Sequence, residues 1–186
     1  MPPKLKITKD EIVQTALNVV RIGGEQAINA RTLANILNCS TQPIFSNFAT
    51  MEELHYAVAV QGHILFQKYM DQEVSSGKYP YYKAHGMAYI RFAMEERELF
   101  KLLFMCDRSG KPIPADDALN NKMHGVIQET TGLNDKESKL FHLEMWAYVH
   151  GIATMFATGF VDLEWNLVEN MLTDAYQGLR KQYGME

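Results

Sequence analysis

The sequence predicts an all-α protein with two parts, a small three-helix domain over residues 1–50 and a larger helical domain over residues 51–186. Apolar residues recur at spacings of three and four along most of the chain, which is the period of an amphipathic helix. No segment shows the sustained alternation of apolar and polar residues that marks a half-buried strand. With 186 residues and 47% hydrophobic content, the chain is long enough to bury a substantial core.

Capping residues, glycines and prolines divide the chain into its predicted helices. Thr8 is the predicted N-cap of a helix that runs through about Ile22 and ends at a pair of glycines. Asn29 is expected to cap the next helix. A long helix begins near Met51 and runs toward residues 75–77. Beyond it, helices are predicted over residues 81–95, 98–106, 116–130, 135–159 and 164–183, with a break at the proline-containing turn 109–114.

Residues 27–54 contain two short helices joined by a tight turn and followed by the start of a third. Each short helix has a predicted buried stripe, comprising Leu33, Ala34, Ile36 and Leu37 in the first and Ile44, Phe45 and Phe48 in the second. In the turn, Asn38 suits the left-handed conformation that ends a helix. Ser40 is expected to cap the second helix by accepting a hydrogen bond from the backbone N–H of Gln42 or Ile44. This order is the layout of a helix-turn-helix DNA-binding domain.

The fixed spacing of many residues in this region resembles the N-terminal domain of the tetracycline-repressor (TetR) family. The matching positions are Ala16, Leu17, Val20, Gly24, Ala27, Arg31, Leu33, Ala34, Leu37, Ser40, Ile44, Phe45, Phe48, Glu53 and Leu54. Two further segments, 99–104 and 146–151, are similar to the TetR-type ligand domain named after its Trp-His-Gly signature. The resemblance implies a dimeric transcriptional regulator, and specifically a repressor that a small apolar ligand releases from double-stranded operator DNA.

The second helix of the motif is expected to lie in the major groove with its polar side chains toward the bases. Arg31, near the start of the preceding helix, resembles a phosphate or base contact of the family. The predicted DNA-binding residues are Lys6, Arg31, Thr41, Gln42, Pro43, Phe45, Ser46, Asn47 and Thr50. The amides of Gln42 and Asn47 can pair with adenine, and a solvated position is the alternative for each. The helix starts near Asn29 and after Thr50 are expected to offer N–H groups to phosphates.

This region carries less positive charge than the TetR pattern. Phe45 and Met51 stand where the pattern usually has Tyr and Lys. No Lys or Arg occurs over residues 32–67. Because neutralising phosphates supplies much of the affinity for DNA, we expect modest binding or a contribution from the N-terminal tail. The lysines at positions 4, 6 and 9 are either phosphate contacts or a charged, fraying end.

Two stripes on the last two predicted helices indicate a helix-packing surface. They comprise the small residues Ala147, Gly151, Thr154 and Thr158 on one helix and the apolar residues Val168, Met171, Leu172, Ala175 and Leu179 on the other. The stripes either close the core of one chain or form a four-helix interface in a homodimer. We favour the dimer because the resemblance implies it and because a two-fold operator requires a two-fold body.

The larger domain is rich in Met and aromatic residues, which indicates either an adaptable apolar cavity or an ordinary core with Met as filler. The resemblance to a ligand domain favours the cavity. The predicted ligand-binding residues are Gln61, Leu65, Phe104, Met105, Met123, His124, Ile127, Trp146 and His150. For a histidine on an apolar helix, a hydrogen-bonded core position is the alternative.

No catalytic motif is present, since the sequence lacks a phosphate loop, a nucleophile elbow and a dinucleotide fingerprint. Glu52 and His55 form one Glu-x-x-His pair, whereas di-metal helical bundles use two. Cys39 and Cys106 lie too far apart in sequence to indicate a disulfide framework or a zinc site. We therefore expect no enzyme, no cofactor and no metal. Two alternatives stay open: a helical small-molecule-binding or metabolic protein with a vestigial DNA reader, and a regulator controlled by a protein partner.

The hydropathy pattern bears on location. No apolar run reaches the length of a membrane span, and the N-terminal residues lack the apolar core of a signal peptide. We expect a cytoplasmic protein without a membrane partner.

Overall fold

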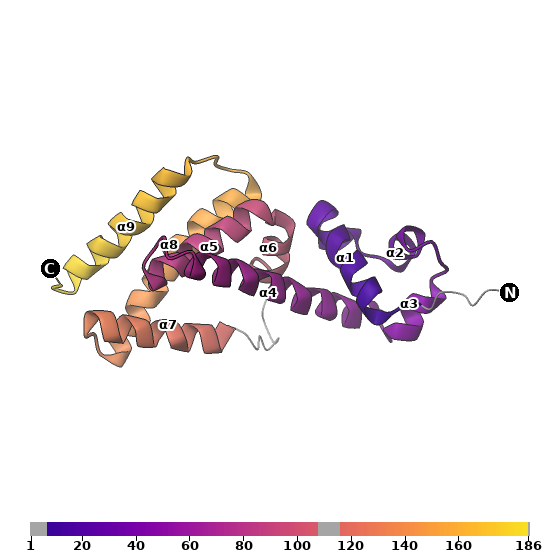
Figure 1. Cartoon of the computed structure of the whole chain (residues 1–186), viewed down its shortest axis with the longest axis horizontal. Helices are drawn as coiled ribbons and strands as arrows, with labels where there is room; N and C mark the ends of the chain where they lie inside the picture. The colour runs from indigo at the N-terminus through magenta and orange to yellow at the C-terminus, as the bar shows by residue number, and fades with distance from the viewer. Residues whose placement is uncertain (1–6, 108–115, 186) are drawn as a thin grey trace. The chain divides into compact units, whose positions relative to one another are not determined.

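The computed structural model describes residues 7–107 and 116–185, with side chains from residue 122 onward in the second range. Within these residues the chain is helical and contains no strand, which confirms the all-α class (Figure 1). The helices are α1 (Lys9–Gly23), η1 (Glu25–Ala27, 3-10), α2 (Ala30–Ile36), α3 (Gln42–Asn47), α4 (Met51–Ser75), α5 (Tyr81–Glu95), α6 (Arg97–Phe104), α7 (Asp116–Thr131), α8 (Asp135–Thr158) and α9 (Trp165–Gln182). The predicted turn 109–114 lies outside the described residues, and no described helix is both long and apolar enough to cross a membrane.

Side-chain caps fix the helix starts that the sequence predicts. Thr8 and Glu11 form a reciprocal capping box, in which the Glu11 N–H donates to Thr8 Oγ1 at 3.2 Å and the Thr8 N–H donates to Glu11 Oε2 at 2.7 Å. At the start of α2, Asn29 Oδ1 accepts the Thr32 N–H at 2.9 Å. Helix α1 ends before Gly24, whose φ of 78° is readily adopted only by glycine. These local choices settle where the first two helices begin and where the first one ends.

The first compact unit combines α1, η1, α2, α3 and the part of α4 through Leu65 with α6. Its core is formed by the buried side chains Ile12, Ala16, Val20, Leu33, Ile44, Phe48, Leu54, Val58, Leu99 and Leu103. At Gly62 of α4, an added Cβ would lie 3.2 Å from the side chain of Leu103 in α6, so glycine permits a close approach of these helices. The division at residue 50 is a prediction about function and stays one, whereas this compact unit extends into α4 and takes in α6.

An ion pair links α1 to the start of α6 within this unit. Glu96 lies between α5 and α6 and is only 6% exposed. Its carboxylate accepts two hydrogen bonds from the Arg21 guanidinium, one of them from Nε at 2.7 Å. A carboxylate taken out of water without such a partner is costly, so the pair anchors the start of α6 on α1.

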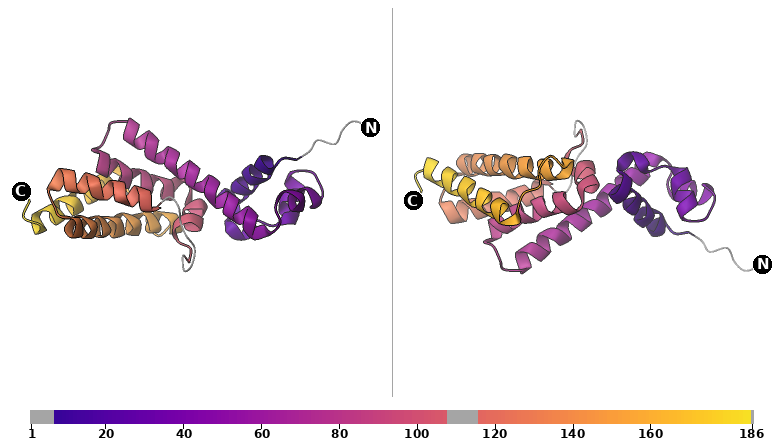
Figure 2. Two further views of the ribbon diagram at one scale, coloured as in Figure 1. Left: turned by 90° about the horizontal axis from the view of Figure 1, so that it is seen from below. Right: turned by 90° about the horizontal axis from the view of Figure 1, so that it is seen from above.

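The second compact unit contains the end of α4 from Phe66, α5, α7, α8 and α9. Helix α8 packs most extensively on α5 and also lies against α7 and α9 (Figure 2). Side chains that are almost fully buried between these helices include Met87, Ile90, Phe92, Phe141 and Phe156. At Gly86 of α5, an added Cβ would lie 3.1 Å from the Leu172 side chain, so glycine lets α9 approach α5.

Candidate nucleic-acid interface and ligand domain

The turn between α2 and α3 has the left-handed residue that the sequence predicts. Asn38 has a φ of 50°. Its N–H donates to the Asn35 carbonyl at 3.2 Å, and the Cys39 N–H donates to the Ala34 carbonyl at 2.9 Å. These bonds satisfy carbonyl groups at the end of α2. The helix, tight turn and second helix are therefore all present in the predicted order.

The predicted cap at Ser40 is wrong. The residue that precedes α3 is Thr41, with φ −70° and ψ −14°, and no side chain caps the helix. Because Thr41 is already in the helical region, its carbonyl accepts the N–H groups of Ile44 and Phe45 at 3.1 and 3.3 Å. Pro43 occupies the first turn, where its missing N–H loses no helical bond. The turn enters α3 through backbone bonds alone, which leaves Ser40 outside the helix start.

Two residues assigned to buried stripes lie at the surface instead. Ile36 of α2 is 58% exposed and Phe45 of α3 is 52% exposed. Ile44 and Phe48, one helical turn apart, are buried in the core. Phe45 is rotated by about 100° from Ile44 around the helix axis. A helix as short as α3 buries one narrow face, so the ring of Phe45 is left at the surface.

The polar side chains of α3 differ in the hydrogen-bonding capacity that they retain. Ser46 Oγ donates to the Gln42 carbonyl at 2.8 Å. Asn47 Nδ2 donates to the Pro43 carbonyl at 2.8 Å and lies 3.5 Å from the Ile7 carbonyl oxygen. Gln42 is exposed, and its side chain has no hydrogen-bond partner in the described part of the chain. Of the two amides predicted to read bases, the Gln42 amide is the one that keeps both ends available.

The start of α4 is already capped within the chain. Thr50 Oγ1 accepts the Glu53 N–H at 3.2 Å, and the Glu53 carboxylate accepts the Ala49 N–H at 2.8 Å. The Ala49 backbone bond, followed by a bond from Lys9, lowers the pKa of Glu53. The Glu53 N–H, in the first turn of the helix whose start was predicted to face phosphates, therefore already has a protein partner.

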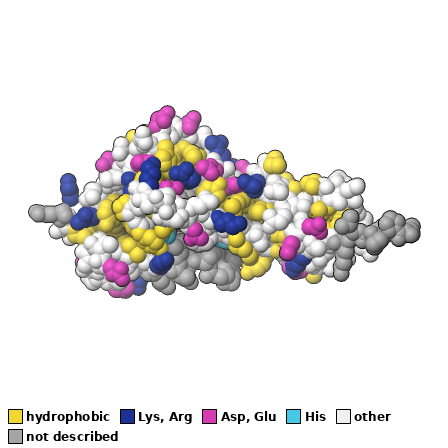
Figure 3. All heavy atoms as spheres, in the orientation of Figure 1, with side chains coloured by type: hydrophobic (Ala, Val, Ile, Leu, Met, Phe, Trp, Pro, Cys, Tyr) yellow, Lys and Arg dark blue, Asp and Glu magenta, His cyan; other side chains and the backbone are white. Residues whose placement is uncertain are grey.

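The cations of the described helix-turn-helix domain, residues 7–50, are Lys9, Arg21 and Arg31. Lys9 Nζ lies 3.1 Å from a carboxylate oxygen of Glu53, and Arg21 pairs with Glu96. Arg31 is exposed and has no ion-pair partner among the described residues. Figure 3 shows mainly apolar and uncharged surface over the α2 and α3 end of this unit. Lys6, the other predicted cation, lies outside the described residues.

The predicted ligand-binding residues divide between the two compact units. Gln61, Leu65, Phe104 and Met105 belong to the first unit, and Met123, His124, Ile127, Trp146 and His150 belong to the second. Ile127 is 1% exposed and forms an apolar core with Phe141 and Met145, which is the ordinary-core alternative for that residue. Trp146 is 42% exposed. A cavity that unites all nine residues stays a prediction.

Two tyrosine–histidine pairs join α5 to α8 in the second unit. The Tyr82 hydroxyl lies 3.0 Å from His142 Nδ1, and the Tyr89 hydroxyl lies 2.9 Å from His150 Nδ1. The Trp146 ring stacks on His150, with ring centroids 4.9 Å apart and an interplanar angle of 14°. Sequence reasoning missed Tyr82, Tyr89 and His142 as a group. The available signal was a seven-residue spacing on α5 and an eight-residue spacing on α8, each close to two helical turns.

Burial keeps the first of these pairs uncharged. Desolvation lowers the pKa of His142 to about 4, and the adjacent His124 lowers it further by charge repulsion. The rings of His124 and His142 meet edge to face at 5.1 Å. Burial also raises the pKa of Tyr82. At neutral pH the Tyr82–His142 pair is therefore a hydrogen bond between neutral groups.

The α8 part of the predicted dimer surface is exposed in the single chain. Ala147, Gly151 and Thr158 are exposed, and Thr154 is half-buried. A Cβ added at Gly151 would meet no atom within 4 Å. The neighbouring apolar side chains Leu140 and Leu143 are 48% and 57% exposed. Apart from Thr154, these residues of α8 have no described intramolecular cover.

The α9 part of that prediction requires correction. Val168 and Leu172 are 0% and 3% exposed within the single chain. Ala175 and Leu179 pack against the apolar core around Ile127. Met171 is half-buried. Val168, Leu172, Ala175 and Leu179 therefore pack within their own chain, because α9 must bury its apolar face to pack on α5 and α8.

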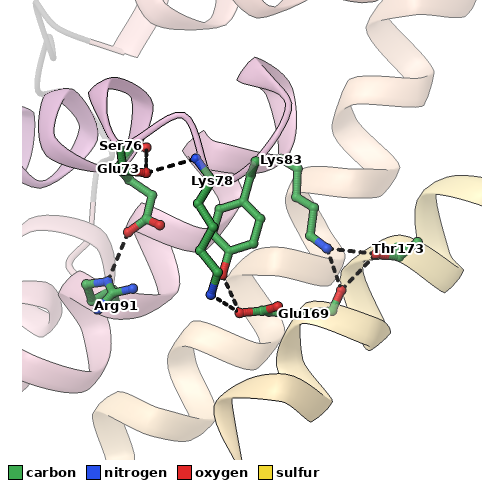
Figure 4. Close-up of polar contacts among 8 residues, drawn as sticks. Glu73, Ser76, Lys78, Lys83, Arg91, Glu169 and Thr173 are labelled. Carbon is green, nitrogen blue, oxygen red and sulfur yellow. Dashed lines mark hydrogen bonds and ion pairs between the residues drawn. The ribbon is translucent and has the colours of Figure 1, made fainter.

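A polar cluster also fixes the connection between α4 and α5 to α9 (Figure 4). Glu169 of α9 accepts hydrogen bonds from Lys78 Nζ at 2.5 Å and from the Tyr79 hydroxyl. Lys83 Nζ donates to the Glu169 carbonyl at 2.9 Å and to the Thr173 hydroxyl at 2.8 Å. The bonds from Lys78 and Tyr79 lower the pKa of the Glu169 carboxyl. The position of α9 is thus set by charge pairing as well as by apolar packing.

Comparison with known proteins identifies relatives of this architecture. Residues 82–175 match a family model described as the tetracyclin repressor-like C-terminal domain. The chain is similar in fold to a solved structure of a TetR family protein from Vibrio parahaemolyticus, with a TM-score of 0.65 and 15% sequence identity. The similarity covers 91% of this chain and 96% of that one. No curated protein sequence matches the chain.

Proposed function

Because the chain belongs to the tetracyclin repressor-like (TetR) family of transcriptional regulators, we propose that it binds operator DNA as a homodimer and represses transcription until a small apolar ligand releases it. In this proposal, residues 1–50 bind DNA and residues 51–186 bind the ligand and dimerise. The observation that carries DNA binding is the α2–turn–α3 arrangement, with Asn38 left-handed and Gln42 and Phe45 exposed on α3. In this layout the second helix enters the major groove.

The charges of the domain favour particular roles for its side chains. Arg31, exposed and without a described ion-pair partner, contacts phosphate in the proposed complex. Gln42 reads adenine through its available amide. Lys9 and Arg21 already pair with carboxylates, so few cations remain to release counterions from DNA. We therefore expect specific binding with a shallow dependence on salt.

The proposed dimer uses the uncovered face of α8. Glycine in a helix interior costs roughly 0.5–1 kcal/mol relative to alanine, and no close packing in the described chain requires Gly151. A second copy of α8 crossing at Gly151 accounts for this choice and would cover Leu140 and Leu143. Two copies related by a two-fold axis present two α3 helices to successive major grooves.

The proposed effector binds in the second compact unit and changes DNA binding through α4. The Trp146–His150–Tyr89 group offers aromatic surface with a polar partner, and the Trp146 ring of this group is partly exposed. Helix α4 is continuous and belongs to both compact units. A ligand changes operator affinity only if it binds one position of this helix better than another, and a tenfold effect needs about 1.4 kcal/mol of such preference.

The test is a mobility-shift titration of the full chain with duplex fragments from the region upstream of its own coding sequence. We expect one fragment to be retarded in the presence of excess unrelated DNA. Arg31→Ala should weaken binding to all fragments. Arg97→Ala removes the same charge from an exposed position on α6 and serves as the matched control. No retardation by a folded dimer would overturn DNA binding and favour the helical small-molecule-binding or metabolic protein, which mass spectrometry of co-purified molecules would then test.

We also propose that the protein acts in the cytoplasm and catalyses no reaction. Regulation of transcription requires access to DNA. Cys39 and Cys106 are free thiols, which suits a reducing compartment.

A further inference from the structure

We propose that Phe45 recognises the 5-methyl group of a thymine in the major groove, and that each operator half-site contains A·T pairs read jointly by Phe45 and Gln42. This inference rests on the proposed function and names the bases that the same surface reads.

The first reason for this proposal is the exposed position of Phe45 on α3. Its ring is 52% exposed, whereas Ile44 and Phe48 of the same helix are 0% and 1% exposed. A single exposed apolar residue is ordinary on a protein surface. Phe45, however, lies on the second helix of a helix-turn-helix, which is the helix that enters the major groove. The apolar feature that base edges present there is the thymine methyl group, and Phe is among the side chains that contact it.

The second reason is that the hydrogen bonds of α3 leave the Gln42 amide available. Ser46 and Asn47 donate to backbone carbonyls of their own helix, at 2.8 Å in each case. Gln42 keeps an available amide, and an amide of this kind pairs with adenine N6 and N7. Gln42 and Phe45 are three residues apart and are therefore neighbours on the helix surface. One polar and one apolar contact of this kind match the adenine and thymine edges of A·T pairs.

The third reason is the lack of positively charged side chains on α3. The commonest specific contact to guanine is a bidentate bond from Arg or Lys. Residues 32–67 contain neither Arg nor Lys, so the exposed face of α3 lacks that contact. The surface therefore discriminates in favour of A·T and against G·C.

The test measures the contribution of single methyl groups. Binding sites are enriched from a random duplex pool with the full wild-type chain, and each thymine of the enriched site is then replaced singly by deoxyuridine. This replacement removes the methyl group and preserves the base pair. Burying one such group is worth about 0.8 kcal/mol, which corresponds to about a fourfold change in Kd. We expect at least one thymine in each half-site whose replacement weakens wild-type binding by about fourfold.

Variants assign the effect to Phe45. Phe45→Ala should bind the thymine and uracil duplexes with equal affinity, and Phe45→Leu, which stays apolar, should retain part of the difference. Gln42→Ala is the matched control on the same face, because it should lose the preference for adenine and retain the methyl effect. Circular dichroism and thermal unfolding verify the fold of each variant.

Two results would overturn the assignment while leaving DNA binding intact: specific binding by wild type that no uracil replacement weakens, or an undiminished methyl effect in folded Phe45→Ala. If the folded dimer enriches no sequence from the pool, the proposed function is wrong and the role of Phe45 falls with it.

Discussion

Tyr82 and His142 face each other inside the second unit, and burial controls the charge of both. The pKa of His142 falls from 6.5 to about 4, first through desolvation and then through His124. Between these values the unfolded chain binds a proton that the folded chain does not. The stability linked to His142 is therefore fully present above about pH 6.5 and is lost as the pH falls toward 4.

We predict that His142→Asn, which keeps a hydrogen-bonding group without a titrating ring, flattens the pH dependence of unfolding. Between pH 6.5 and 4, wild type should lose up to about 3 kcal/mol more unfolding free energy than the variant. Urea unfolding at several pH values, followed by the fluorescence of Trp146 and Trp165, measures the difference. An equally steep slope in His142→Asn would show that another group titrates.

Met51, the first residue of α4, stands where the family pattern usually has Lys. We predict that Met51→Lys tightens binding to every duplex and steepens the plot of log Kd against log salt by about 0.9 per half-site, because one more phosphate is neutralised. Val60→Lys adds the same charge to an exposed position two or more turns along α4 and is the control. Identical salt slopes for Met51→Lys and wild type would show that residue 51 does not approach the backbone of DNA.

Among the elements, α6 lies within the stretch that matches the C-terminal domain model, yet it folds with the helix-turn-helix domain in the first unit. The cause is visible in two contacts. Leu103 packs at Gly62 of α4, and Glu96 at the start of α6 binds Arg21 of α1. A segment that is contiguous with α5 in sequence is therefore an integral part of the other unit.

Breaking this anchor should destabilise the first unit. We predict that Arg21→Ala lowers the free energy of unfolding by about 1–3 kcal/mol, because the buried Glu96 carboxylate loses its partner. The double variant Arg21→Ala/Glu96→Gln should recover part of the loss, since it removes the unpaired charge. Lys101→Ala breaks a more exposed pair with Glu98 and should cost less than about 1 kcal/mol. Chemical denaturation compares the three, and a double variant as unstable as Arg21→Ala would contradict the role of the charge.

For the whole molecule, the question is how two copies meet. The exposed stripe on α8 leaves one helix face without described cover, whereas the α9 stripe is used inside the chain. The proposed assembly therefore depends on α8 more than the sequence indicated.

We predict that Gly151→Leu separates the dimer without unfolding the chain. The added side chain has open space within the protomer but would clash at a close helix crossing, at a cost of about 1–3 kcal/mol or more per site. Gly125→Leu on α7, also in open space, is the matched control and should stay dimeric. Sedimentation velocity measures the oligomeric state, and a well-folded Gly151→Leu dimer would move the interface away from this residue.

The sequence by itself determined the helices and the helix-turn-helix. Thr8, Asn29 and Asn38 act on backbone groups within a few positions, so their effects are readable from local order. The sequence also located the candidate DNA-binding surface, but it did not show which side chains of that surface are free of hydrogen bonds to the protein. The cap expected at Ser40 failed because the backbone of Thr41 already satisfies the start of α3.

Only the tertiary structure decided which face of each helix is covered. Ile36 and Phe45 lie at the surface, and Val168 is buried in its own chain, because burial depends on partners from distant segments. The Tyr82–His142 bond joins residues 60 positions apart, and no local pattern specifies which helices will pack together. Local hydrogen bonding and periodicity define elements, whereas the pairing of elements depends on the complementarity of surfaces that form only when the chain has folded.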